Sequence, residues 1–464
     1  MAGHYTPRLP QVAIRTRPAL GAADIHWRAS LRCAASYYGL VTSLPFAGSP
    51  LRRRGVLMAT LFAAQVCGST GFSMSMAVGA IMAAAITGSN TWSGLPVGVG
   101  SLGTALASWP LSRLMARFGR RPGLTVGYSL AVVGAALGML GVVQQSFALF
   151  LTGMALFGTA NTSNLLARYA AADISPGAQR GRAMGLIVWG SAVGSIVGPI
   201  LMNPAIRVGA ALGVSSVASA FLISITGYAL AAILVQAFLR PDPLAIARRL
   251  EPASAMPGGG RARATGAILR EPRVVVAYGT LMVSQLVMIG TTSTSPLYLH
   301  DQGHGVSTIG LAVSLHLGGM YVASPLSGWL CDRFGRLPMI GAGGIVLLLA
   351  LALAGFAPGH TSGLVIAGLF LNGVGWNLAF VSASALLTDA LSPVERASIQ
   401  GLADLVMGLM GAVGSALGGM ILGGWGFGIL NMLGAAMLVL PLAASWLERE
   451  AIAASAAEPN PWAS

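Results

Sequence analysis

The chain alternates long apolar runs with short charged gaps, and its basic residues gather in every second gap. All 27 basic residues are arginine, and 26 of them lie in every second gap. Only Arg207 lies in one of the intervening gaps. Arginines beside apolar spans stay in the cytoplasm. The pattern therefore predicts an integral membrane protein with an even number of spans and both termini in the cytoplasm. The arginine-bearing gaps are Met1–Arg54, Arg113–Arg121, Arg168–Arg182, Arg240–Arg273, Arg333–Arg336, Arg396 and Arg449.

Composition agrees with a membrane protein and argues against other classes. Hydrophobic residues make up 55% of the chain and charged residues only 9%, whereas a soluble domain carries about 25% charged residues. The net charge of +14 is divided among short gaps, so it does not form the basic face of a nucleic-acid-binding domain. Cys33, Cys67 and Cys331 have the spacing of neither a disulfide framework nor a zinc site.

About 20 apolar residues are needed to cross about 30 Å of hydrocarbon, and the sequence contains twelve such stretches. We expect an all-α integral membrane fold in the cell inner membrane, with one six-helix bundle at 55–239 and a second at 274–447. The expected spans are 55–80 (which can extend to Thr87), 94–114, 122–143, 147–170, 183–204, 214–238, 274–298, 306–330, 338–357, 362–388, 398–422 and 427–447.

Three polar segments lie outside the bundles. Residues 1–54 lack the apolar core of a signal peptide, and their scattered Arg, Pro and Gly favour a disordered cytoplasmic tail. Translation from Met58 is the alternative. Residues 240–273 contain five prolines and a run of three glycines, which favours a flexible cytoplasmic linker. Residues 448–464 are expected to form a second cytoplasmic tail.

The two halves of the chain repeat one another at an offset of about 216 residues. Pro110-Leu-Ser is followed by Arg117-Phe-Gly-Arg-Arg-Pro122, and Pro325-Leu-Ser is followed by Arg333-Phe-Gly-Arg-Leu-Pro338. Each copy falls after the second span of its half. Six spans repeated once, with matching loops, is the plan of a two-bundle secondary transporter.

The second copy, Gly328-Trp-Leu-Cys-Asp332-Arg333-Phe-Gly335-Arg336, resembles the signature loop of the major facilitator superfamily. The first copy departs from the family pattern, because Ser112 replaces its glycine and Ala116 its aspartate. In the family this loop locks the inner gate. The resemblance therefore implies gating roles for Gly328, Asp332, Arg333, Gly335 and Arg336, and for Arg113 and Arg117 of the first copy.

Asp332 has a predicted partner across the bundle interface. It can face the N-terminal end of span five, where the helix dipole is positive and where Arg180 and Arg182 lie. A gating role for these two arginines follows, and the alternative is that they only fix topology. Gly335 is expected to permit a tight turn after the loop.

A second gate contact is predicted from the repeat. Asp404 lies about two turns inside span eleven, the end that symmetry places against the first signature loop. We expect Asp404 to pair with Arg113 or Arg117 and so to replace the charge that is missing at Ala116, and the alternative is that Asp404 carries protons.

Span five carries small residues that resemble a motif of the proton-antiporting drug exporters of the family. The alternative is close packing against a neighbouring helix. Two other exporter features are missing, because Met154 stands where those proteins carry an arginine and residues 55–87 contain no charge. The small residues are Gly190, Gly194, Gly198 and Pro199.

Polar side chains inside a membrane are costly and tend to mark function. In the resembled family, spans one, four, seven and ten line the central cavity, and the polar residues here cluster in these spans. We expect contact with substrate or gate, and the alternative is hydrogen bonding between helices. A bend is expected at Gly68-Ser-Thr-Gly71. The predicted substrate-binding residues are Gln65, Asn161, Asn164, Gln285, Asn372, Trp376 and Asn377.

His316 is the one ionisable side chain that the spans place near the middle of the membrane. An unperturbed imidazole has a pKa of about 6.5, which suits proton exchange. His316 is therefore the candidate for proton coupling. A neutral histidine that bonds a neighbouring helix is the alternative.

The sequence predicts a transporter and no enzyme, since it has no phosphate loop, nucleophile–base set or metal cluster. We expect alternating-access transport of a neutral or weakly anionic, partly aromatic solute, as proton-coupled export. Proton-coupled or facilitated uptake is the alternative, and a non-transporting receptor or scaffold is the alternative from another class. The expected partners are a small-molecule substrate, membrane lipid and protons, with no cofactor, metal or nucleic acid. The chain is expected to act as a monomer.

Overall fold

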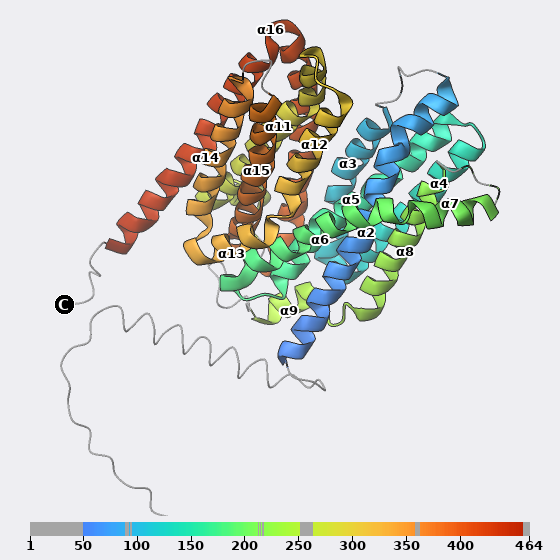
Figure 1. Ribbon diagram of the computed structural model, residues 1–464. Coiled ribbons are helices and arrows are strands. Elements are labelled where there is room, and N and C mark those ends of the chain that lie inside the picture. Colours follow the sequence, from blue (N-terminus) through green and yellow to red (C-terminus); the bar gives the residue numbers. More distant parts are fainter. Residues whose placement is uncertain are drawn as a thin grey trace, which may run out of the picture. The chain divides into compact units, whose positions relative to one another are not determined.

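The fold is helical wherever the chain can be followed, and it forms two bundles (Figure 1). From Arg54 onward the helices belong to one compact unit. In Figure 1 the N-terminal bundle runs from blue to green and the C-terminal bundle from yellow to red. The structure is a computed structural model, and it describes residues 50–457 except 89–91, 93–94, 212, 214, 216–217, 251–262 and 358–361.

The N-terminal bundle contains six long helices. The expected extension of the first span to Thr87 is confirmed, and the short helix α7 follows α6 where the sequence predicted the end of span five. The bounds are α2 (Pro50–Thr87), α3 (Leu95–Phe118), α4 (Arg120–Val143), α5 (Phe147–Asp173), η2 (Gly177–Gln179), α6 (Arg180–Ile200), α7 (Met202–Ala211) and α8 (Ala220–Phe238).

The C-terminal bundle repeats this plan with two differences. Span eight is divided into two helices just before Pro325, which lacks the N–H that would bond the preceding turn, whereas α3 continues through the equivalent Pro110. Spans eleven and twelve are joined directly at Gly426, whose φ of 85° breaks the helix. The bounds are α11 (Pro272–Asp301), α12 (Val306–Tyr321), α13 (Ser324–Phe334), α14 (Arg336–Gly355), α15 (Ser362–Ala390) and α16 (Pro393–Ala457).

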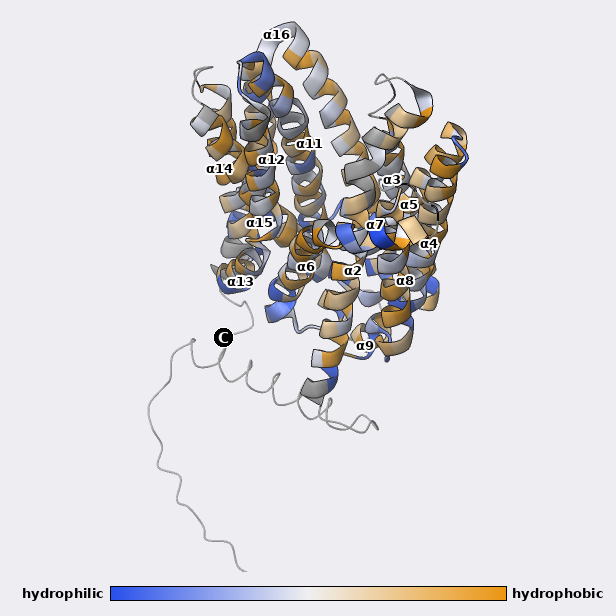
Figure 2. Ribbon diagram, turned by 45° about the vertical axis from the view of Figure 1, so that its right-hand side comes forward, coloured by the Kyte–Doolittle hydropathy of each residue, from blue (hydrophilic) through white to orange (hydrophobic). Residues whose placement is uncertain are grey.

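Nine helical stretches of the described chain are long and apolar enough to cross a membrane. One of them, α16, contains two predicted spans, and α3 and α5 have spanning length but are more polar. Apolar colour covers much of the long helices in Figure 2, whereas blue gathers on α7, α9 and the ends near α13. The predicted all-α fold of two six-helix bundles is confirmed.

The expected bend in the first span is wrong. Helix α2 remains helical through Gly68–Gly71. The two glycines instead let other side chains approach: a Cβ at Gly68 would collide with the amide oxygen of Asn164, and one at Gly71 would lie 2.9 Å from the ring of Tyr228. These residues serve helix packing.

The described parts of the predicted linker are ordered. Short helices α9 (Pro243–Leu250) and α10 (Thr265–Ile268) flank residues 251–262, which lie outside the described residues. Arg263 donates to both carboxylate oxygens of Glu395, at 2.9 and 3.0 Å, and these hydrogen bonds raise the pKa of Arg263. The linker is therefore anchored to the C-terminal bundle.

The predicted tails lie mostly outside the described residues, namely 1–49 and 458–464. Their inner ends are helical, since α2 begins at Pro50 and α16 continues to Ala457.

The two bundles meet at one end, which we call the arginine end. It comprises the turns at Arg117–Arg121, Asp173–Arg182, Arg333–Arg336 and Asp389–Arg396. Here α3 packs against α16, and α6 packs against α13. Gly119 and Gly335 make matching turns with φ of 102° and 95°, so the tight turn predicted at Gly335 is confirmed. The sequence predicts that this end faces the cytoplasm.

Candidate functional site

A cavity lies between the two bundles and is lined from both of them. It encloses about 540 Å³ of space between protein atoms, part of which is open to solvent. Helices α2, α5 and α6 line one side, and α12 and α15 line the other. The lining residues are Gln65, Ser69, Phe72, Asn161, Asn164, Leu165, Arg168, Val188, Ser191, Ser195, Tyr321, Trp376 and Phe380.

Three amide side chains predicted from the sequence line this cavity from the N-terminal bundle. Gln65 Nε2 donates to Ser191 Oγ at 2.8 Å, while its buried Oε1 meets no donor among the described residues. Asn164 Oδ1 accepts a hydrogen bond from the Tyr128 hydroxyl at 2.8 Å, which holds Asn164 in place. Asn161, half-buried, lies one turn away. Gln65 and Asn161 can therefore offer hydrogen bonds to a solute.

An aromatic wall faces these amides from the C-terminal bundle. Trp376 stacks on Phe380 with ring centroids 4.6 Å apart and an interplanar angle of 15°. The indole N–H of Trp376 donates to Gln285 Oε1 at 2.8 Å. Gln285, also predicted from the sequence, does not line the cavity itself, but it fixes the orientation of the indole ring.

The other two predicted residues of α15 lie away from the cavity lining. Asn377 Nδ2 donates to the Met320 carbonyl at 2.6 Å and to Ser324 Oγ at 2.7 Å. This geometry fits the alternative of hydrogen bonding between helices. Asn372 is 1% exposed, and its amide has no hydrogen-bond partner in the part of the chain that the structure describes.

A buried ion pair at the cavity wall was missed from the sequence. Arg168 Nη2 donates to Asp404 Oδ1 at 2.6 Å, and the two side chains are 1% and 0% exposed. The predicted pairing of Asp404 with Arg113 or Arg117 is wrong. Those two arginines are exposed and lie over the rings of Trp109 and Phe118.

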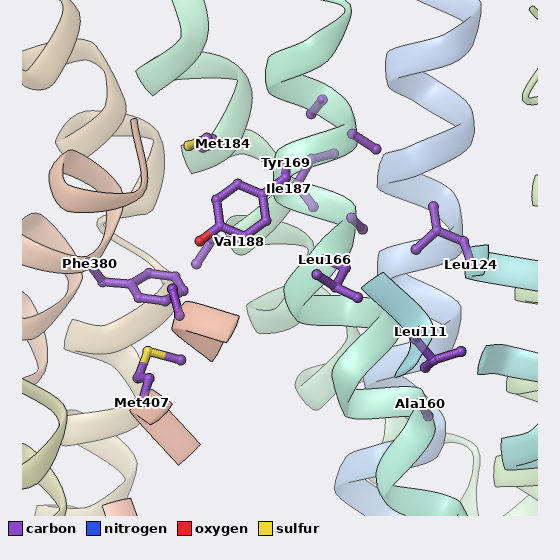
Figure 3. Close-up of a cluster of buried hydrophobic side chains, with 14 of the residues drawn as sticks. Leu111, Leu124, Ala160, Leu166, Tyr169, Met184, Ile187, Val188, Phe380 and Met407 are labelled. Atoms are coloured by element: carbon purple, nitrogen blue, oxygen red, sulfur yellow. The ribbon is translucent and has the colours of Figure 1, made fainter. Parts of the chain in front are cut away.

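The sequence predicts Arg168 at the boundary between the span 147–170 and an arginine-bearing gap, but α5 continues to Asp173 and carries Arg168 inside the protein. Its guanidinium lies between two rings, 4.2 Å from the centroid of Tyr169 and 4.3 Å from that of Phe380. Figure 3 shows Tyr169 and Phe380 reaching toward each other from the two bundles. Arg168 is thus a cation held by aromatic faces at the bundle interface.

The second signature loop contacts α6, as the sequence predicts for Asp332. Its carboxylate accepts hydrogen bonds from the backbone N–H groups of Gly181, at 3.0 Å, and Arg182, at 2.8 Å. Such bonds satisfy the free N–H groups that begin a helix. Asp332 also pairs with Arg336 at 3.1 Å, and the Arg182 side chain itself is exposed.

The rest of this contact involves a second aspartate. Asp389 pairs with Arg180 across the interface at 2.6 Å and with Arg336 at 3.0 Å. Gly328 lies directly against the backbone of Gly181, where a side chain on either residue would collide. Arg333 is exposed. The gating roles of these residues remain predictions.

The first signature loop makes a different contact. Gly401 of α16 lies against Ser112 of α3, so the two helices meet as the repeat predicts. The buried Arg120 pairs with Asp173 at 2.8 Å and donates to Gln400 at 2.6 Å. A neutral amide from the opposite bundle therefore supplies an acceptor at the loop that lacks an aspartate.

The small residues of span five pack α6 against α2. A Cβ at Gly190 would lie 3.0 Å from Gln65, one at Gly194 2.8 Å from Thr70 N, and one at Gly198 2.9 Å from Ser73 Oγ. These contacts fit the packing alternative. Pro199 follows in the same helix.

His316 is buried within the C-terminal bundle. Its Nδ1 lies 2.9 Å from the carbonyl of Leu369 and its Nε2 3.3 Å from Thr292 Oγ1. These partners come from α15 and α11, and His316 does not line the cavity. Within the described residues, no group of three His, Cys, Asp or Glu side chains could hold a metal ion.

Comparison with known proteins agrees with this architecture. The family model of the Major Facilitator Superfamily matches residues 61–307 and 281–464. The uncharacterized MFS-type transporter YdeG of Bacillus subtilis is 33% identical over 86% of this chain and 94% of its own length. The riboflavin transporter RfnT of Brucella anthropi is 30% identical over 82% of this chain and 92% of its own length.

Among solved structures, the human organic anion transporter MFSD10 (TETRAN) has the same fold. Its TM-score is 0.66 at 15% identity, over 84% of this chain and 99% of that one. The family match and the curated relatives both cover most of the sequence. The chain therefore belongs to the Major Facilitator Superfamily and is a multi-pass membrane transporter rather than an enzyme.

Proposed function

We propose that this transporter moves a small organic solute by alternating access, with the cavity between the bundles as the binding site. The observation that carries the proposal is the lining of one cavity by both bundles, with Gln65 on one side and Trp376 on the other. A solute held there contacts both moving parts. The contacts at the arginine end close one exit, so the described state fits an outward-facing conformation.

The lining favours a flat, partly aromatic solute that is neutral or weakly anionic. Trp376 and Phe380 offer stacked ring faces, while Gln65 and Asn161 offer amides for the polar edge of such a solute. Arg168 is the charged group of the lining. The similarity to a riboflavin transporter supports this class of solute, because riboflavin combines a flat ring system with a polar edge.

Proton-coupled export is the direction that the sequence favours, through the glycines of α6. Uptake is the second candidate, and two observations support it. Met154 and the uncharged residues 55–87 depart from the exporter pattern, and the α6 glycines have a packing role against α2. His316 remains the coupling candidate of the sequence. A receptor or scaffold that moves no solute is the alternative from another class.

The test is flux of radiolabelled riboflavin through proteoliposomes that contain the purified protein. Trp376→Ala should weaken uptake affinity at least about tenfold, the equivalent of 1.4 kcal/mol, since it removes the ring face of the cavity. Trp425→Ala is the matched control, because Trp425 is 69% exposed and far from the lining. Absence of riboflavin flux would overturn the proposed solute, and equal effects of the two substitutions would overturn the proposed site.

A further inference from the structure

The ion pair between Arg168 and Asp404 joins the two bundles, because Arg168 belongs to α5 and Asp404 to α16. It lies where the cavity ends, since Arg168 belongs to the lining and Asp404 is fully buried behind it. A contact in this position has to break when the bundles separate at the arginine end. Separating two buried charges costs several kcal/mol unless one of them is neutralised.

Arg168 and Asp404 differ in how many other groups stabilise their charges. Arg168 also donates to Ser384 Oγ at 3.3 Å, to the Tyr169 hydroxyl at 3.0 Å and to the Leu165 carbonyl, and two aromatic rings cover its faces. Asp404 Oδ2, by contrast, has no hydrogen-bond partner among the residues that the structure describes. Arg168 can therefore remain charged without Asp404, whereas Asp404 depends on Arg168.

We infer that Asp404 is the proton-binding residue of this transporter, and that its protonation releases Arg168 and with it the contact between the bundles. The proton comes from water on one side of the membrane, forms the O–H bond of the Asp404 carboxyl group, and leaves to water on the other side. Arg168 keeps its charge throughout. This inference rests on the proposed transport function and deepens it.

The neighbours of Asp404 are consistent with a single titrating acid in a cationic setting. The charged and titratable groups that face it are Arg168 and Tyr169 of α5, Arg120 of α4 and Tyr278 of α11. The arginines of α3 are exposed and point to their own helix. An anion is favoured while Arg168 is close, and a neutral acid is favoured once the bundles part.

His316 lacks this dependence on the state of the transporter. Its hydrogen-bond partners, Leu369 and Thr292, lie in the same bundle as His316 itself. Movement of one bundle against the other leaves those contacts unchanged. A coupling residue must have different surroundings in the two states, so Asp404 fits the requirement and His316 does not.

The first test uses proteoliposomes and labelled riboflavin. Asp404→Asn, which mimics the protonated acid, should lose accumulation driven by a pH gradient yet retain exchange of riboflavin at equal pH. Asp404→Glu should restore gradient-driven accumulation in part, and His316→Gln should keep it. Gradient-driven accumulation by Asp404→Asn would overturn the inference. Absence of riboflavin exchange by the wild-type protein would overturn the proposed solute, and exchange without coupling would overturn only the inference.

A second measurement is independent of the solute and of how well the Asp404 variant folds. Phe118 and Phe334 are exposed at the arginine ends of the two bundles, and spin labels on cysteines at these positions report the separation of the bundles. Acidification should lengthen the label distance in the wild-type background and in His316→Gln. Asp404→Asn should show the longer distance at every pH. A distance between the two labels that does not change with pH in the wild-type background would overturn the inference.

Discussion

The arginine end contains two charge clusters that the repeat makes equivalent, and they differ in one residue and in burial. The C-terminal cluster consists of Asp332, Arg336, Asp389 and Arg180. Subtracting 216 from the first three numbers, or adding it to the last, gives the N-terminal cluster: Ala116, Arg120, Asp173 and Arg396. The equivalent of Asp332 is missing there, and Gln400 Oε1 from the opposite bundle accepts a hydrogen bond from Arg120 instead.

The difference shows how a contact between the two bundles tolerates the loss of a charge. In the C-terminal cluster, two carboxylates balance two guanidinium groups at a partly exposed surface, and Asp389 is 29% exposed. In the N-terminal cluster, Asp173 pairs with both Arg120, at 2.8 Å, and Arg396, at 3.6 Å, and it is 0% exposed. One buried anion therefore holds two cations, which predicts that the N-terminal cluster is the more fragile of the two.

The largest expected effect comes from neutralising the two equivalent aspartates in turn. Asp173→Asn removes a buried anion that pairs with two buried arginines, which should cost about 3–5 kcal/mol of stability. Asp389→Asn should cost at most about 1 kcal/mol, because its site is partly solvated. Thermal unfolding of the purified variants measures both. Similar shifts in the melting temperature would contradict the difference between the clusters.

The second-largest expected effect concerns Asp332, which is present in the C-terminal cluster and is replaced by Ala116 in the N-terminal cluster. Asp332→Asn removes the anion that accepts the backbone N–H groups of Gly181 and Arg182, and bonds to charged groups contribute about 1.5–3 kcal/mol each. Transport should fall at least about tenfold while the protein still reaches the membrane. Arg333→Gln is the control, because its side chain is exposed. Normal flux in Asp332→Asn would remove the basis for a gate at this loop.

The smallest effect tests whether the lost charge can be restored. By the repeat, Ala116→Asp is expected to place a carboxylate near the N-terminal part of α16, where the equivalents of Gly181 and Arg182 are Ala397 and Ser398 in the second turn. An anion at a helix N-terminus contributes about 0.3–1 kcal/mol. The melting temperature should rise slightly and transport should slow, because the closed arginine end becomes more stable. A lower melting temperature would mean that the two loops are no longer interchangeable.

Most of the fold can be predicted from the sequence, because the two patterns that predict it lie in short stretches of the chain. Arginine placement gives the spans, and the repeated loop predicts the contact between Asp332 and α6. The pair of Arg168 and Asp404 escaped prediction, since its members are 236 residues apart and the apolar run of α5 ends before the helix does. Which polar side chains reach the cavity also depends on depth along the helix: Trp376 lines it, whereas Asn372, one turn earlier on the same face of α15, does not.

The turn at Gly426 connects the arginine end of α16 to a surface that faces the lipid. Helix α16 leaves the arginine end, reverses at this one residue, and returns until Glu448 lies 3.7 Å from Arg273. A connection of a single residue gives the two arms little freedom to slide, so a shift near Gly401 is carried into the second arm. That arm exposes Leu440, Trp446 and Leu447 on the outer surface, where acyl chains press against it. We therefore expect the lateral pressure and thickness of the bilayer to bias the opening of this transporter.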